Sequence, residues 1–408
     1  MPVAIIGRRP ARRVMCAMRV HALAAVTVAT IPFLWQTPAA TVGRPGLTPI
    51  ACPAQTWAPD DPAFDALPGA RAFFGSYEGG LYRIEIPEHW NGELMLSAHG
   101  FVSNAGAQGS RLRVGLPAIR QHLIDEGFAW AASSYRCNGY VPGMGLQDTM
   151  ALTGMLTRFN NGTAPRRVYL TGTSMGGHVT LLGMHEFPTQ LAGALAMCPA
   201  GPELFDYFTA VGAAAEVITG VTFESPSTVA ADTRRMAELL GEPPNYTEQG
   251  RQLASVEIEL SGGPRPFAAQ GLRSRFLQNV SGGALAGGTT PSNRAATNQH
   301  YTYRVDESLG LTSARFSEAV RRKAPDLSTR SASGPYDELV PFDGHLERPV
   351  LTMHGTGDLF VPIHLEQTLN RAVAAAGTSD LRDAGRQFTD PVREGDPGGL
   401  TVGPALHP

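Results

Sequence analysis

One short segment constrains the fold of this chain more than any other: Gly172-Thr173-Ser174-Met175-Gly176-Gly177. A strand-like run of β-branched and aromatic residues over 167–171 leads into it, and a helix-compatible stretch follows to about residue 186. A serine on a sharp turn between a strand and a helix is strained, so the residues two before and two after it must be small. Gly172 and Gly176 meet that requirement. The segment therefore predicts that Ser174 presents its oxygen clear of the backbone as a nucleophile.

Strand and helix patterns alternate on both sides of this segment. The strand over 81–86 alternates apolar and polar residues, as a half-buried strand does. Further strands are predicted over 94–98, 128–133, 192–197 and 349–353, and helices over 116–126 and 147–159. This alternation indicates βαβ units, and so an α/β fold with a mostly parallel central sheet flanked by helices.

A long interval separates the strand over 192–197 from the one over 349–353, and we interpret 199–345 as an inserted, largely helical cap. Ser227 can N-cap a helix that ends at Gly241, and a second helix is predicted over 315–322. Residues 281–298 are rich in Gly, Thr, Ser and Asn and are expected to form a mobile loop. The catalytic core is then 73–198 together with 346–380, preceded by a loose lead-in over 41–72.

The N-terminal residues 1–40 have the pattern of an export signal. Arginines precede an apolar run over 20–35, and the small residues Pro38-Ala39-Ala40 follow it. The run is short for a membrane span, although an uncleaved anchor is the alternative. The chain is rich in Arg, Ala, Gly and Pro, as in a GC-rich bacterial gene. We therefore expect a secreted or periplasmic bacterial protein with no stable membrane span after cleavage.

Composition and cysteine content narrow the class further. Apolar residues make up 43% of the 408 residues and charged residues 17%, which is typical of a globular enzyme. The formal net charge of −3 gives no basic face for a nucleic-acid partner. Cleavage would remove Cys16 and leave Cys52, Cys137 and Cys198. Because three is an odd number, one thiol is free or pairs elsewhere, and the pairing stays open.

A second motif, His99-Gly100-Phe101, follows the buried strand over 94–98. Acyl transfer needs two backbone amides directed at the developing oxyanion. Met175, the residue after the candidate nucleophile, supplies one of them, and Phe101 is the candidate for the other. His99 has two interpretations, a buried histidine that braces this loop or a residue that takes part in the chemistry.

A third motif, His354-Gly355-Thr356-Gly357-Asp358, follows the buried strand over 349–353. Open α/β sheets place their sites at the carboxyl ends of strands, and a carboxylate there can orient an imidazole and stabilise the imidazolium. Asp358 is the candidate for this role. It could instead cap the next helix, in which case Glu203 or Asp206 would be the alternative acid.

In this order along the chain, the three motifs resemble those of the α/β-hydrolase superfamily, and within it secreted bacterial esterases and lipases with a cap. The resemblance covers about residues 73–377. It implies an eight-stranded, mostly parallel sheet and a Ser–Asp–His triad in that chain order. Ser174 would be the nucleophile and Asp358 the acid, with Phe101 and Met175 forming the oxyanion hole. It implies no metal or organic cofactor and a small-molecule or lipid-like ester as substrate.

The triad base is the part of the family pattern that this chain lacks. The pattern requires a further strand after the acid and then a loop with the histidine, but the apolar residues of 381–408 are too scattered for a strand. The histidines after Asp358 are His364, at the start of a predicted helix that Gly377 ends, and His407, the penultimate residue. A third hypothesis is that 381–408 is an atypical, frameshifted tail and that the original histidine has been lost from the C-terminus.

Three functions follow from these features. The first is a serine hydrolase that cleaves carboxylic esters through an acyl-enzyme on Ser174. The second is a peptidase or acyltransferase on the same fold. The third is a binding protein that kept the fold and lost its base, against which the intact turn around Ser174 argues, because a strained turn is costly to keep without use. Aromatic residues of the predicted cap, such as Phe205 and Tyr207, would line a substrate pocket or form the cap's own core.

Overall fold

The computed structural model describes residues 56–57, 64–104, 109, 111–223, 227–285, 295–325, 341–377 and 400–402. The chain divides into two units, Met1–Val42 and Gly43–Pro408, and every described residue belongs to the second. The predicted export signal over 1–40 and His407 therefore lie outside the described residues.

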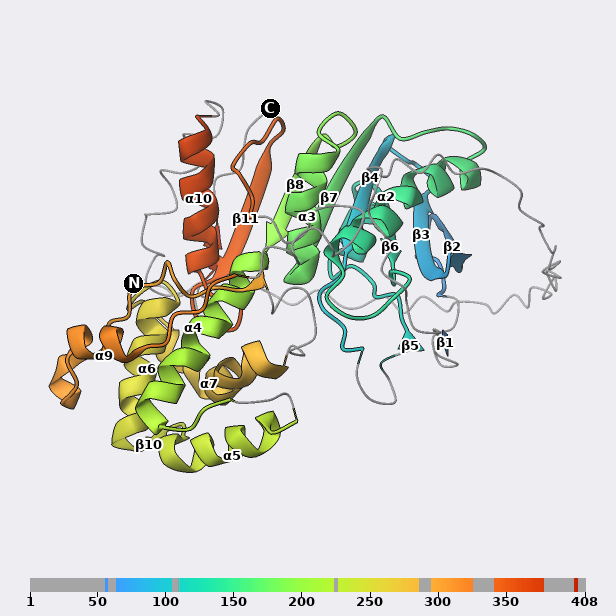
Figure 1. Ribbon diagram of the computed structural model, residues 1–408. Coiled ribbons are helices and arrows are strands. Elements are labelled where there is room, and N and C mark those ends of the chain that lie inside the picture. The colour runs from blue at the N-terminus through green and yellow to red at the C-terminus, as the bar shows by residue number, and fades with distance from the viewer. Residues whose placement is uncertain are drawn as a thin grey trace, which may run out of the picture. The chain divides into compact units, whose positions relative to one another are not determined.

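An eight-stranded sheet forms the centre of this second unit (Figure 1). Its spatial order is β12-β11-β8-β7-β4-β6-β3-β2. The strands are β2 (Ala70–Tyr77), β3 (Gly80–Pro87), β4 (Glu93–Ala98), β6 (Ala129–Ser133), β7 (Arg167–Thr173), β8 (Gly193–Met197), β11 (Val350–Gly355) and β12 (Leu400–Val402). The pairings among β6, β4, β7, β8 and β11 are parallel, and the other three pairings are antiparallel. The predicted fold class, a mostly parallel central sheet, is confirmed.

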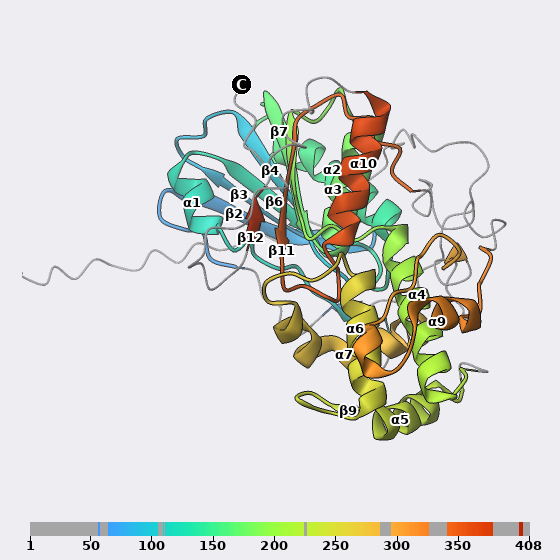
Figure 2. The same ribbon diagram turned by 90° about the vertical axis from the view of Figure 1, so that its left-hand side faces the viewer.

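Helices cover both faces of the sheet. Because side chains of a strand alternate between its faces, Ala129 and Ala131 of β6 join one apolar cluster whereas Trp130 and Ala132 join another. The first cluster includes residues of α2 (Pro142–Phe159) and α3 (Met175–Glu186), with Leu369 of α10 (His364–Ala376) packed against it. The second includes α1 (Arg120–Asp125). Figure 2 shows α2, α3 and α10 on one side of the sheet and α1 on the other.

The strand β3 is buried along its whole length, although its alternating pattern predicted a half-buried strand. Its polar residues have partners inside the protein. The Glu85 carboxylate accepts hydrogen bonds from Arg120 Nε at 2.7 Å and from Trp130 Nε1 at 2.8 Å. Arg83 Nη1 donates to the carbonyl oxygen of Val114. A charged side chain can be buried when it is paired and hydrogen-bonded. For this reason the alternation of apolar and polar residues in β3 did not predict that both of its faces are buried.

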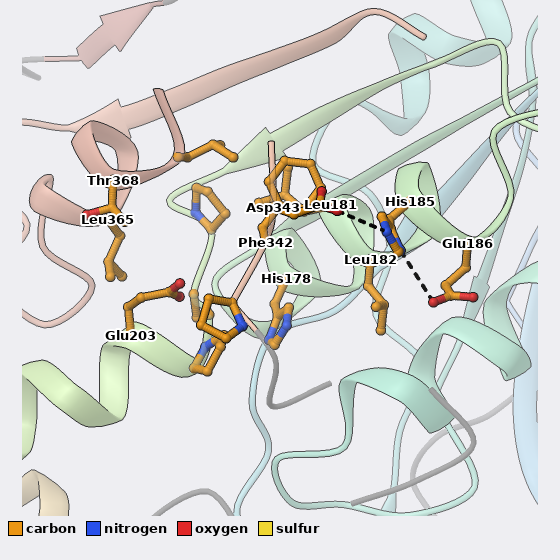
Figure 3. A pocket seen from close by; sticks show the side chains of 16 residues that line it. His178, Leu181, Leu182, His185, Glu186, Glu203, Phe342, Asp343, Leu365 and Thr368 are labelled. Carbon is orange, nitrogen blue, oxygen red and sulfur yellow. Dashed lines mark hydrogen bonds and ion pairs between the residues drawn. The ribbon is translucent and has the colours of Figure 1, made fainter. Parts of the chain in front are cut away.

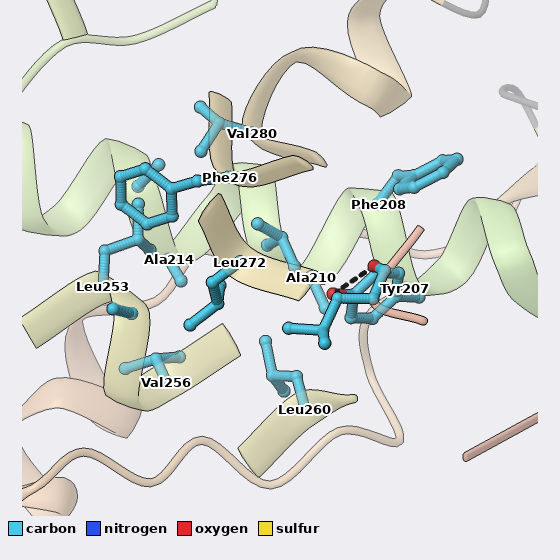
Figure 4. Packing of buried hydrophobic residues seen from close by; sticks show 14 of the residues in the cluster. Tyr207, Phe208, Ala210, Ala214, Leu253, Val256, Leu260, Leu272, Phe276 and Val280 are labelled. Atoms are coloured by element: carbon cyan, nitrogen blue, oxygen red, sulfur yellow. Dashed lines mark hydrogen bonds between the residues drawn. The ribbon is translucent and has the colours of Figure 1, made fainter. Parts of the chain in front are cut away.

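Helices dominate the segment between β8 and β11, which we call the helical insertion. They are α4 (Pro202–Thr219), α5 (Val229–Leu240), α6 (Glu248–Leu260), α7 (Ala268–Leu285) and α9 (Ser313–Ala319), with the 3₁₀ turn η1 (Glu307–Leu309). Side chains of α4, α6 and α7 meet in one apolar cluster (Figure 4). Phe205 and Tyr207, which were expected to line a pocket or to form the cap's own core, are both buried. That the insertion serves as a cap stays a prediction.

Several boundaries differ from those that the sequence predicted. The strand β2 starts at Ala70, and the short strand β1 (Thr56–Trp57) pairs with β5 (Arg111–Leu112), so the lead-in over 41–72 is partly ordered. Residues 281–285 continue α7 instead of forming a loop. The tail does contain a strand, β12, which is antiparallel to β11. A two-stranded hairpin in the insertion pairs β9 (Gly241–Glu242) with β10 (Asn245–Tyr246).

Within the described ranges, no helix has the length and apolar character that a membrane crossing needs.

Candidate active site

Ser174 occupies a strained turn between β7 and α3. Its backbone has φ 60° and ψ −122°, a conformation that residues other than glycine rarely adopt. The turn is fixed from both sides, because Ser174 N donates to the Met197 carbonyl at 3.0 Å and the Ser174 carbonyl accepts from Ala200 N at 3.0 Å. The side chain is half-buried. These two hydrogen bonds hold the backbone of Ser174 in the strained conformation that the sequence predicted.

Glycines are required around Ser174 by close backbone approaches. A Cβ atom on Gly172 would overlap the carbonyl group of Gly176, and one on Gly176 would overlap the carbonyl oxygen of Ala98. At Gly177, a Cβ atom would lie 2.7 Å from Pro199 Cα. No side chain larger than hydrogen fits at these positions without a backbone shift.

The loop after β4 lies directly beside Ser174. A Cβ atom on Gly100 would lie 3.5 Å from Ser174 Cβ and 3.9 Å from Ser174 Oγ. Phe101 follows Gly100, and its side chain is 55% exposed. Met175 is the first residue of α3 and is buried. The structure therefore brings the segments of both oxyanion-hole candidates to Ser174, and their role in binding an oxyanion stays a prediction.

His99 is braced within the same loop. Its ring stacks on Tyr135 with a centroid separation of 3.8 Å. The ring nitrogens Nδ1 and Nε2 lie 2.7 Å and 3.0 Å from the carbonyl oxygens of Gly100 and Ser134. Burial lowers the pKa of His99, while the two carbonyl groups raise it. These contacts are those of a histidine that supports the loop.

Asp358 lies in the turn over 355–361, directly after β11. Its Oδ1 accepts hydrogen bonds from the amides of Phe360 and Val361, both at 2.9 Å. The helix α10 begins at His364, with Ile363 as its N-cap. The carboxylate thus closes its own turn and does not cap the helix, which was the alternative role for this residue.

Ser174 and Asp358 follow strands that end at the same edge of the sheet. In the parallel register, Thr173 of β7 is paired with Met197 of β8, and Met197 is paired with Met353 of β11. Two strand spacings amount to about 10 Å, so the two residues are on neighbouring but separate loops. Of the alternative acids, Asp206 is buried in the insertion, where it accepts from Thr297 N at 2.7 Å. Glu203 is in the first turn of α4, three residues after Ala200, whose amide donates to the Ser174 carbonyl.

No hydrogen bond joins a histidine ring to Ser174 Oγ or to the Asp358 carboxylate within the part of the chain that the structure describes. His364 is buried at the start of α10, and its Nε2 is 2.8 Å from the hydroxyl of Tyr301. Burial lowers the pKa of His364 to about 3, so it is neutral at ordinary pH. The tail strand β12 runs from the level of Gly355 back to that of Met353, away from the edge where Ser174 lies.

One group of described residues has the composition of a metal site. Cys198, His354 and Asp358 each offer a ligand atom, and these atoms lie within 4.8 Å of one another. However, His354 Nε2 is 2.6 Å from the Val361 carbonyl oxygen, to which it must donate, and Asp358 Oδ1 already accepts two amides. Burial raises the pKa of the Cys198 thiol to about 11, which disfavours the thiolate that metals bind. The arrangement therefore fits a packed turn better than a metal centre.

The cysteines are now partly assigned. Cys198 is a free thiol, and Cys137 is disulfide-bonded. The partner of Cys137 lies outside the described residues.

Two cavities lie beside α10, and Ser174 lines neither of them. The first has a volume of about 230 Å³ and lies between α3, the start of α4 and α10, with leucines and Phe342 on its wall (Figure 3). The second has a volume of about 460 Å³ and a polar lining that includes Glu259, His300, Tyr301 and Arg371.

Sequence reasoning missed two residues near the site. His178, one turn of α3 after Ser174, lines the first cavity, with its Nδ1 2.8 Å from the Tyr140 hydroxyl. Burial lowers its pKa to about 4. Its position four residues after Ser174 was a signal in the sequence, because such residues share one helix face. Arg265 contacts the turn that carries Asp358, and nothing in the sequence marks it.

The sheet order and the strained strand–Ser174–helix turn define an α/β-hydrolase fold. No protein-family model and no curated protein matches the sequence. Among solved structures, the chain is similar to an esterase from Aspergillus oryzae (15% identity, 77% of this chain and 70% of that chain, TM-score 0.39). It is also similar to the rice cell wall degrading esterase LipA from Xanthomonas oryzae (15% identity, 74% and 76%, TM-score 0.37) and to feruloyl esterase B from Aspergillus oryzae (14% identity, 77% and 71%, TM-score 0.39). These similarities are too remote to carry a functional assignment.

Proposed function

We propose that the chain is a serine hydrolase that cleaves carboxylic esters through an acyl-enzyme on Ser174. The observation that carries this proposal is the backbone of Ser174, a half-buried serine with φ 60° between a strand and a helix. Such strain persists only where surrounding structure imposes it, and it clusters at sites of chemistry. Here three glycines and two backbone hydrogen bonds impose it.

In this reaction Ser174 Oγ attacks the ester carbonyl carbon and loses its proton to a base. The negative charge that develops on the carbonyl oxygen is stabilised by the amides of Met175 and Phe101. The tetrahedral intermediate collapses, the alcohol leaves with the proton from the base, and an acyl-serine ester remains. Water then attacks this ester by the same route and releases the acid. Asp358 orients the base and stabilises its protonated form.

The base belongs, in this proposal, to the chain after Gly377. His407 is its candidate, and the loss of the original histidine through a shifted reading frame is the alternative. We further propose that the helical insertion serves as a cap, that the protein is exported by residues 1–40, and that its substrate is a small-molecule or lipid-like ester.

One observation favours a second function, a binding protein that retains the fold with impaired catalysis. Within the described ranges, Asp358 Oδ1 is occupied by the amides of its own turn and no imidazole is hydrogen-bonded to the carboxylate. Without a base, a serine hydrolase keeps only the catalysis that its oxyanion hole and substrate binding provide.

A substrate series separates these functions. Hydrolysis of p-nitrophenyl acetate, butyrate and octanoate is compared with that of matched p-nitroanilides in the full chain and in Ser174→Ala. We expect ester hydrolysis that falls by at least about 10³-fold in the variant. Faster cleavage of anilides would indicate a peptidase. Ester hydrolysis that persists in Ser174→Ala would refute the assignment, and a folded wild-type chain without any hydrolysis would favour the binding protein.

A further inference from the structure

The turn over 355–361, which we call the acid turn, is held by side chains of the helical insertion. The Thr356 carbonyl oxygen accepts a hydrogen bond from Arg265 Nε at 2.6 Å, and the Asp358 carbonyl oxygen accepts one from Arg265 Nη2 at 3.3 Å. The next carbonyl oxygen, that of Leu359, accepts from Tyr207 Oη at 3.1 Å and from Asn279 Nδ2 at 2.8 Å. Three backbone carbonyl groups around the acid are therefore fixed by residues far away in the sequence.

Arg265 is itself firmly anchored. It lies between α6 and α7, and its third nitrogen, Nη1, donates to Ser261 Oγ at 3.1 Å and to the Gly263 carbonyl oxygen at 2.9 Å. The planar guanidinium group thus bridges the insertion and the acid turn, a geometry that a lysine ammonium does not reproduce.

The charge of Arg265 has no direct carboxylate partner among the described residues. Desolvation lowers the pKa of Arg265, whereas the nearby charge of Asp358 raises it. The guanidinium group and Asp358 therefore interact electrostatically across the turn.

Backbone contacts leave the acid turn little freedom to move away from the insertion. A Cβ atom on Gly271, in the first turns of α7, would overlap the carbonyl oxygen of Gly357. A Cβ atom on Gly357 would lie 2.9 Å from Phe267 Cβ. The backbone of the insertion and that of the acid turn are thus in direct contact, in addition to the hydrogen bonds from Arg265.

We propose that Arg265 is a positioning residue that holds the acid turn and thereby orients the Asp358 carboxylate. The orientation follows from the turn because Asp358 Oδ1 is tied to the amides of Phe360 and Val361. This inference rests on the proposed function, in which Asp358 is the triad acid. It also assigns the insertion a part in building the site, beyond covering it.

A double-mutant cycle tests whether Arg265 acts through Asp358. The rate of p-nitrophenyl butyrate hydrolysis is measured for Arg265→Gln, Asp358→Asn and the double variant. We expect Arg265→Gln to lower kcat at least 10-fold with KM changed less than 3-fold, and to cause less than a further 3-fold loss when Asp358 is already Asn. Equal losses in both backgrounds would show that Arg265 acts independently of Asp358 and would overturn the proposal.

The matched control is Arg322→Gln, because Arg322 Nη1 likewise donates to backbone carbonyl oxygens, those of Asn298 and Tyr301, but within the insertion. We expect its kcat to stay within 3-fold of the wild-type value. If Arg265→Gln does not fold, Arg265→Lys is used instead, because it keeps the positive charge but lacks the planar guanidinium group. We expect its kcat to fall by more than 3-fold. A kcat equal to that of wild type in this variant would contradict the need for a planar bridge.

Hydrogen exchange provides a readout that needs no catalysis. The peptide that contains the amides of Phe360 and Val361 is followed by mass spectrometry in wild type, Arg265→Gln and Arg322→Gln. We expect exchange to become at least 10-fold faster in Arg265→Gln alone. Unchanged exchange would overturn the claim that Arg265 holds the turn. If wild type hydrolyses no ester, the proposed function fails, while this measurement still decides whether the turn depends on Arg265.

Discussion

Gly176 and Ala98 are in such close contact that a Cβ atom on Gly176 would overlap the carbonyl oxygen of Ala98. The first turn of α3 thus meets the end of β4 backbone to backbone, directly beside Ser174. This close packing is the reason that a glycine stands two residues after Ser174 in the sequence. It fixes Ser174 at φ 60° and places the amide end of α3 beside its side chain.

Replacing Gly176 with alanine should therefore disrupt both stability and activity. The added methyl group forces α3 away from β4, and overpacking of this kind costs about 1–3 kcal/mol of the free energy of unfolding. Because the shift also moves Ser174, we expect ester hydrolysis to fall by more than about 100-fold, as misplacement by 1 Å can cause. Urea unfolding and initial rates measure the two effects.

The control for this variant is Gly154→Ala. Gly154 is exposed in α2, and a Cβ atom there would meet no atom within 4 Å. Because alanine is a better helix former than glycine, this change should raise the free energy of unfolding by about 0.5–1 kcal/mol and leave activity unaltered. A Gly176→Ala protein as stable and as active as Gly154→Ala would contradict the described packing.

Glu257 should make the stability of the protein depend on pH. It is fully buried in α6, where it accepts a hydrogen bond from Asn279 and lies 3.3 Å from the Tyr207 hydroxyl, and burial raises its pKa from 4.5 to about 8. Between pH 4.5 and 8 the folded state keeps a proton that the unfolded state has lost. The stabilising contribution of this proton is therefore complete below pH 4.5 and is lost as the pH rises to about 8.

A glutamine at position 257 cannot titrate, so the urea midpoint of Glu257→Gln relative to wild type should rise steadily from pH 5 to pH 8. Taking the difference between the two proteins removes the contribution of other groups. The control, Glu248→Gln at the exposed start of the same helix, should show no such trend. A constant difference between wild type and Glu257→Gln would show that Glu257 does not hold a proton in the folded state.

His364 should make the protein less stable as the pH falls, which is the opposite of the effect of Glu257. Burial lowers its pKa from 6.5 to about 3, so the folded state resists a proton that the unfolded state accepts. The stability that depends on the neutral ring is complete above pH 6.5 and is lost as the pH falls toward 3. His364→Gln should therefore lose less stability than wild type between pH 6.5 and 4, as followed by thermal unfolding.

The control is His122→Gln, a substitution at an exposed histidine of α1, whose stability curve we expect to follow that of wild type. His364→Gln should also retain ester hydrolysis within about 3-fold, since the ring is bonded to Tyr301 and has no contact with Ser174. Loss of hydrolysis in a folded His364→Gln protein would instead make His364 the base.

The parts of the fold that the sequence predicts are those fixed by local patterns. The turn at Ser174 and the strand before Asp358 were predictable because glycines and apolar runs are required within a few residues of the site. The burial of β3 was not, since it depends on Arg120 and Trp130 meeting Glu85 from other elements. Arg265 was missed for the same reason, because its contacts to the acid turn join residues about 90 positions apart.

The triad base is the role that no local pattern of the sequence predicted. The sequence after Gly377 has no regular apolar pattern, and of the region over 381–408 the structure describes only β12.

The central claim is that Ser174 is an activated nucleophile, and a fluorophosphonate adduct tests it most directly. The full chain is treated with the probe at neutral pH, digested, and mapped by mass spectrometry, with Ser174→Ala as the control. We predict one phosphonylated residue, Ser174, in the peptide that contains Gly172 and Gly176, and no adduct in Ser174→Ala. A folded protein that stays unmodified, or one that is labelled equally in Ser174→Ala, would contradict the account.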